Sequence, residues 1–180
     1  RERIGSVLAQ VPRLGQSLFQ DQARSMVFVD VSPDGKRIVF QSSRSGNEDI
    51  WVKDLSTGGL TQLTRDGALD ENPVFSPTGD AIVFVSDRTG NKEIFSMAPD
   101  GSNQTRLTQD PGEDLSPHWS PDGRKIIFSR KDAENWDLFA MDRDGHNTVR
   151  LTTHPAAEFG PYWSPDGKWI YFLSDRHFES

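Results

Sequence analysis

Short apolar runs separated by turn residues fill most of the chain. In one stretch the alternation and the β-branched content predict four strands, at residues 74–76, 81–86, 93–97 and 105–108. Pro77-Thr78-Gly79 and Pro99-Asp100-Gly101 stand between strands, where proline presets φ and glycine accepts positive φ. The longest uninterrupted apolar run, Ala81–Val85, is far too short to span a bilayer. The pattern therefore predicts an all-β chain of short strands.

This pattern repeats along the chain at a fixed spacing. Ser-Pro-Asp-Gly begins at Ser32, Ser120 and Ser164, and Ser-Pro-Thr-Gly begins at Ser76, so successive copies are 44 residues apart. Aromatic residues before the Ser-Pro pair, a phenylalanine after the turn and a closing Leu-Thr pair keep the same step. Four-stranded units of this length with aromatic and glycine markers are typical of β-propeller blades. The fold class predicted is thus an all-β propeller with four blade units.

The repeated unit also resembles a known family. Pro-x-Trp-Ser-Pro-Asp-Gly, then Ile-x-Phe-x-Ser-x-Arg, Ile-Phe-x-Met-x-x-Asp-Gly and Arg-Leu-Thr, is similar to the WD-type repeat of TolB-like β-propellers. The resemblance covers about residues 27–176. It implies a periplasmic or otherwise exported bacterial protein connected with the Tol–Pal envelope system. In that family the ring usually has six blades, and an α/β domain precedes it; neither the domain nor the last two blades are recognisable here.

The segment 1–25 does not follow the repeat, and the blades occupy residues 26–180. One interpretation takes Ser6–Val11 and Gln16–Gln20 as outer strands that complete the last blade. The other takes Ile4, Val7, Leu8 and Val11 as one face of a helix that ends at Pro12. Four steps of 44 nearly fill the 180 residues, so the blades form either a closed four-bladed ring or an arc of a larger one. An arc would leave an open edge that favours self-association.

Composition narrows the function classes. Against 20 Lys+Arg stand 27 Asp+Glu, a net charge of −7 that disfavours binding to nucleic acid or to an anionic membrane surface. The absence of cysteine excludes disulfides and thiol chemistry. No nucleophile elbow, phosphate-binding loop or dinucleotide fingerprint is present, and the histidines lack metal-ligand spacing. We therefore expect no enzymatic activity, no cofactor and no metal.

A set of acidic residues is the first candidate site. By the family's fold, the loops before the innermost strands lie at one mouth of the central channel. They would bring together Asp70, Glu71, Glu113, Asp114 and Glu158, with Phe159 beside the last of them. Such a ring of carboxylates would attract a cation or a basic protein segment. The alternative is that these residues are solvated loop acids, or hydrogen-bond acceptors at strand ends.

Two further positions are candidates because they depart from the repeat. Arg44, Arg88 and Arg176 share one position, as partner contacts or as ion pairs with acids such as Asp49 or Glu93, whereas the third unit has Asp132 there. Trp136 replaces Lys92 in a predicted loop, and exposed tryptophan is frequent at interaction hot spots.

The sequence thus predicts a non-catalytic protein-interaction scaffold of the TolB-like type. It would bind a protein or peptide partner, such as an envelope protein or a basic segment, through the loop-lined channel mouth or top face. Two other functions are compatible with the repeat: the gating propeller of a serine oligopeptidase, and a propeller with a metal or sugar site at the channel mouth.

Overall fold

The computed structural model describes residues 26–132 and 135–176, which form strands grouped into four antiparallel sheets. The first sheet contains β1 (Met26–Val31), β2 (Arg37–Ser42), β3 (Asp49–Asp54) and β4 (Leu60–Gln62), with a 3-10 turn, η1 (Ser43–Ser45), after β2. The second contains β5 (Asp70–Phe75), β6 (Ile82–Ser86), β7 (Glu93–Met97) and β8 (Thr105–Arg106). The third contains β9 (Asp114–Trp119), β10 (Lys125–Asp132), β11 (Asn135–Asp142) and β12 (Val149–Arg150). The last contains β13 (Glu158–Trp163) and β14 (Ile170–Ser174). Within these ranges, no helix is long and apolar enough to cross a membrane.

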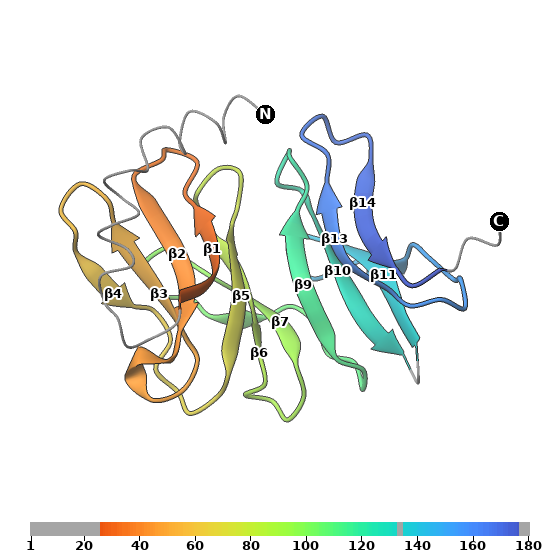
Figure 1. The fold of residues 1–180 in the computed structure, drawn as a ribbon, viewed down its shortest axis with the longest axis horizontal. Coiled ribbons are helices and arrows are strands. Elements are labelled where there is room, and N and C mark those ends of the chain that lie inside the picture. Colours follow the sequence, from red (N-terminus) through yellow and green to blue (C-terminus); the bar gives the residue numbers. More distant parts are fainter. Residues whose placement is uncertain (1–25, 133–134, 177–180) are drawn as a thin grey trace.

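The all-β prediction and the blade units are confirmed. In each of the first three sheets the strands pair in chain order, so that every 44-residue unit becomes one four-stranded blade. The innermost strand is longer than predicted, because β5 begins at Asp70 rather than at Val74. Figure 1 shows the four sheets following one another in an arc from β1 to β14. The two interpretations of residues 1–25 concern a segment outside the described ranges.

A bulge occurs at the same position in all four innermost strands. Phe28, Asn72, Ser116 and Gly160 have φ of 51°, 52°, 53° and 62°, and the pairing register shifts there. A positive φ is unusual for residues other than glycine, so its recurrence indicates a required geometry. The bulge turns backbone N–H groups toward the preceding sheet: Asn72 donates to Gln41 Oε1 at 3.2 Å, and Gly160 donates to Ser129 Oγ at 3.0 Å.

Neighbouring sheets pack face to face through apolar side chains. Val39, Ile50, Val52 and Leu63 of the first sheet meet Phe75, Ile82, Phe84, Phe95 and Met97 of the second. The second and third sheets meet in the same way. The turns also interlock, because the proline of one Ser-Pro-x-Gly turn lies against the glycine of the next: Pro33 against Gly79, Pro77 against Gly123, and Pro121 against Gly167.

The last sheet has the described strands β13 and β14 alone, and one of its faces is uncovered. Tyr171 and Leu173 alternate along β14 and are 60% and 61% exposed, opposite Tyr162 and Phe159 of β13. The corresponding residues of the complete sheets are buried against the next blade. The uncovered face agrees with an arc of a larger ring; the self-association expected of an open edge stays a prediction.

Candidate functional site

Three of the five carboxylates predicted to ring the channel mouth do not face solvent. Asp70, Asp114 and Glu158 are the first residues of β5, β9 and β13, and all three side chains are fully buried. The expectation that they lie in exposed loops is therefore wrong. Each is held inside its own blade, as the alternative of strand-end hydrogen-bond acceptors requires.

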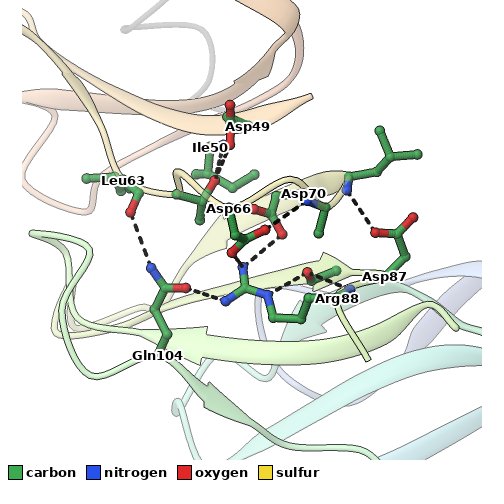
Figure 2. A network of polar contacts seen from close by, with 12 residues as sticks. Asp49, Ile50, Leu63, Asp66, Asp70, Asp87, Arg88 and Gln104 are labelled. Carbon is green, nitrogen blue, oxygen red and sulfur yellow. Dashed lines mark hydrogen bonds and ion pairs between the residues drawn. The ribbon is translucent and has the colours of Figure 1, made fainter. Parts of the chain in front are cut away.

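Arginine neutralises the buried carboxylate of the second blade. Figure 2 shows Arg88 at the centre of a network in which its NH2 atom lies 2.9 Å from Asp70 Oδ1 and 3.0 Å from Asp66 Oδ2. Its Nε donates to Ser86 Oγ, and its NH1 donates to Gln104 Oε1. The guanidinium also lies over the rings of two core phenylalanines, Phe84 and Phe95. Charge pairing and stacking together make this arginine a scaffold element.

The third blade builds the same pair from a different position. Arg130 stands two residues before Asp132, and its Nε and NH2 donate to the two oxygens of Asp114 at 2.7 and 2.8 Å. In the last sheet Arg176 pairs with Glu158. The ion-pair interpretation of the arginines is thus confirmed for Arg88 and Arg176. Their partners are the acids that begin the innermost strands, rather than Asp49 or Glu93.

A second buried row lies on the third strands: Asp49 and Glu93 begin β3 and β7, and Asp137 is the third residue of β11. The threonine of each Leu-Thr pair connects this row to the backbone: Thr108 Oγ1 donates to Glu93 and accepts the N–H of Ile94 at 2.9 Å. Thr64 and Thr152 make the equivalent contacts with Asp49 and Asp137. These acids therefore fasten the outer strand and do not form a binding site.

The remaining predicted site residues lie at different places. Glu71 pairs with Lys92 Nζ at 2.6 Å. Glu113 and Asp132 are exposed and line the same surface hollow. Phe159 is exposed on the uncovered face of the last sheet. Trp136 is half-buried within β11, opposite Lys131, and so does not stand in a loop as predicted.

The four innermost strands enclose a central trough. Two adjoining cavities of about 320 and 330 Å³ lie along it. At its middle, one residue from each strand occupies the same repeat position: Asp30, Val74, His118 and Tyr162, which line both cavities. Prolines of the strands and turns form much of the remaining wall. The trough is thus mainly apolar, and its ionisable side chains, Asp30, His118 and Tyr162, lie in one layer.

Two groups of this layer have shifted pKa values. Burial raises the pKa of Asp30, although the carboxylate accepts the N–H of Phe75 at 2.8 Å. Burial lowers the pKa of His118 to about 4, so its imidazole is neutral at pH 7. The His118 ring lies 3.9 Å from that of Tyr162, and its buried Nδ1 has no hydrogen-bond partner among the described residues. Asp30 is therefore the acidic group of a layer whose histidine is neutral.

Sequence reasoning assigned His118 to packing and did not single out Asp30. The signal was present in the repeat, because Asp30 aligns with Val74, His118 and Tyr162 at steps of 44 residues. A charged residue at a position that is otherwise apolar or aromatic stands out only when the units are aligned at that column.

Comparison with known proteins agrees with this architecture. The family model described as the TolB beta propeller domain matches residues 23–132 and 105–180. A TolB-type protein of Agrobacterium tumefaciens is 30% identical, with a TM-score of 0.75 over 85% of this chain and 60% of that one. TolB of Acinetobacter baumannii is 29% identical, with a TM-score of 0.76 over 87% of this chain and 39% of that one.

A more distant structure, a dipeptidyl aminopeptidase IV-type protein of Bacteroides ovatus, shares the fold alone, at 13% identity and a TM-score of 0.65 over 84% of this chain and 26% of that one. No match is found among curated proteins. The chain spans less than two thirds of the length of either TolB protein. The repeat, the blades and the family model agree, and the chain belongs to the TolB β-propeller domain family.

Proposed function

We propose that this chain is a non-catalytic partner-binding module of an exported bacterial protein, and that it binds an extended segment of an envelope protein in the central trough. The observation that carries the proposal is the convergence of all four innermost strands on one mainly apolar trough whose ionisable side chains lie in a single layer. Binding sites for peptides and small molecules commonly combine apolar walls with a few polar groups.

The bulges support this location. They recur in all four strands at the level of the trough, and three of them are followed by proline, at Pro73, Pro117 and Pro161. Proline has no N–H to donate to an additional strand, so the sheet does not continue into the trough at these positions. The proline rings instead form an apolar wall. An apolar wall of this kind suits a bound segment that contacts the trough through its side chains.

The exposed acids belong to a second part of the proposed surface. Glu113 and Asp132 line a hollow beside the third blade, and their side chains are accessible, unlike those of Asp70, Asp114 and Glu158. Together with Glu71, Trp136 and Phe159 they would contact the partner around the trough. The three buried acids would act indirectly, by holding the innermost strands in place.

Site-specific photocrosslinking tests the proposal. A benzoylphenylalanine placed at Tyr162 would report contacts in the trough, because Tyr162 is half exposed there. A matched probe at Val149, an exposed residue on the outer strand β12, controls for nonspecific contact. After incubation with a bacterial envelope extract, we expect a discrete protein adduct at position 162 that is absent at position 149. Identical adducts at both positions, or none at position 162, would contradict the proposal.

A further inference from the structure

The trough contains a carboxylate, that of Asp30, which has no basic partner within residues 26–132 and 135–176. Asp30 accepts backbone hydrogen bonds from Phe75 and Val31, and no cation contributes to its pKa among the described residues. The other residues that line the two cavities are apolar, aromatic or uncharged polar ones, and His118 is neutral because burial lowers its pKa to about 4. A negative charge in surroundings of this kind is costly unless a cation pairs with it.

The blades show what such a carboxylate is paired with elsewhere in the molecule. Arg88 and Arg130 each bind the carboxylate at the start of an innermost strand while the guanidinium lies over two aromatic rings. The trough provides the same two components, a carboxylate at Asp30 and exposed aromatic rings at Phe28 and Tyr162. Within the part of the chain that the structure describes, the guanidinium is the component missing from the trough.

We propose that Asp30 and the aromatic rings of the trough form a binding site for an arginine side chain of the bound partner segment. The guanidinium pairs with the Asp30 carboxylate and stacks on Tyr162, while the methylene groups of the arginine lie along the proline wall. Arginine suits the site better than lysine, because its planar cation is weakly hydrated and stacks on aromatic rings. This inference rests on the proposed function and adds the chemistry that the partner must present.

The site differs from the one that the sequence suggested for a basic segment. That ring of carboxylates is neutralised inside the blades, by Arg88, Arg130 and Arg176. Asp30 lies farther along the innermost strand, past the bulge at Phe28, and its charge remains available to a partner.

A short peptide tests the site without knowledge of the partner. The probe is acetyl-Gly-Gly-Arg-Gly-Gly-amide, titrated into the isotopically labelled full chain and followed by NMR chemical shifts. The matched control is the same peptide with citrulline, which keeps the shape of arginine and removes its charge. We expect shifts at Val74, His118 and Tyr162 with a dissociation constant of roughly millimolar order, as befits one charge-assisted contact.

Two variants test whether the arginine of the peptide contacts Asp30. Asp30→Asn keeps an oxygen that accepts the Phe75 N–H, and it should weaken binding of the arginine peptide by roughly tenfold or more. Asp166→Asn, in an exposed turn, should leave binding unchanged. Equal binding of the citrulline peptide, full binding by Asp30→Asn, or no binding at all would overturn the proposal. Stronger Asp30-dependent shifts with Ca²⁺ than with the peptide would also overturn it, in favour of a metal site.

These results are separable from those on the proposed function. Failure of the arginine peptide together with a trough-specific crosslink at position 162 would remove the arginine site and leave partner binding in place. Binding of the peptide without any crosslink would leave the arginine site in place and contradict the envelope partner.

Discussion

The innermost strands bear two kinds of carboxylate that differ in what the chain provides for them. Asp114, at the start of its strand, is fully buried and receives two hydrogen bonds from Arg130. Asp30, near the end of its strand, faces the trough, and among the described residues its partners are the backbone N–H groups of Phe75 and Val31. The first kind of carboxylate stabilises its own blade, and the second kind is accessible to a ligand. Among the buried acids that begin the innermost strands, each scaffold acid is thus reached by an arginine of its own blade.

The largest effect is expected from removing the arginine of a complete blade. Arg130→Ala leaves the Asp114 carboxylate buried without its cation, which should lower the free energy of unfolding by about 3–5 kcal/mol. Arg124→Ala is the control, because that side chain is 86% exposed and its change should stay within about 0.5 kcal/mol. Urea unfolding followed by tryptophan fluorescence measures both. Similar losses in the two variants would contradict the scaffold role of Arg130.

The same substitution in the last sheet should cost less. The Arg176 side chain is 41% exposed, against 11% for Arg130, because no described strand covers the outer side of β14. Water can replace part of the lost pairing with Glu158, so we expect Arg176→Ala to cost about 1–2 kcal/mol. A loss as large as that of Arg130→Ala, in the same unfolding experiment, would show that the last sheet is enclosed in solution.

Asp30→Asn should change stability in the opposite direction. The pKa of Asp30 is raised in the folded protein, so the folded state holds the proton more tightly than the unfolded state. The wild type therefore loses stability as pH rises from the ordinary aspartate pKa of 3.8 through the raised value, whereas the variant does not. Unfolding at a series of pH values should show the variant gaining on the wild type as the pH rises above 3.8 and through the raised pKa of Asp30. A difference that stays constant with pH would mean that Asp30 is not desolvated.

The smallest effect is expected from the exposed acids. Glu113→Gln and Asp132→Asn remove charges that lie at the surface, and each should change the free energy of unfolding by less than about 0.5 kcal/mol. Thermal unfolding of the two variants beside wild type is sufficient. A loss above about 1 kcal/mol in either would place that residue with the scaffold acids, and would remove it from the proposed partner surface.

The repeat was enough to predict the fold, because turn chemistry and apolar alternation recur in every unit. The third unit shows where alignment alone fails. Its hairpin between β10 and β11 is tighter, so the arginine moves two residues back, to Arg130, and Asp132 occupies the aligned position. A shift of two residues keeps a side chain on the same face of a strand, so the ion pair still forms. In the sequence alignment, by contrast, the arginine is missing from its repeat position.

Burial of the acids was harder to predict than their position. An acid at a loop–strand boundary has the same sequence signature whether it faces solvent or an arginine, and Asp70 and Glu113 illustrate both outcomes. Trp136 was misplaced for a related reason, since β11 extends farther toward the hairpin than β7 does. What decides each case is a contact across the blade, and that contact is not local in sequence.

The interlocked turns have a consequence for how such a chain can change its length. Each proline lies against the glycine of the following turn, as Pro77 does against Gly123, so each such contact joins two turns that are one 44-residue unit apart. Duplication or loss of an entire 44-residue unit leaves all of them intact. At the two ends of the arc, Gly35 has no neighbour at its side-chain position among the described residues, and no later described turn follows Pro165. Gain or loss of whole 44-residue units would therefore preserve these turn contacts. At each end of the arc one of the two residues of a further contact is present, Gly35 at one end and Pro165 at the other.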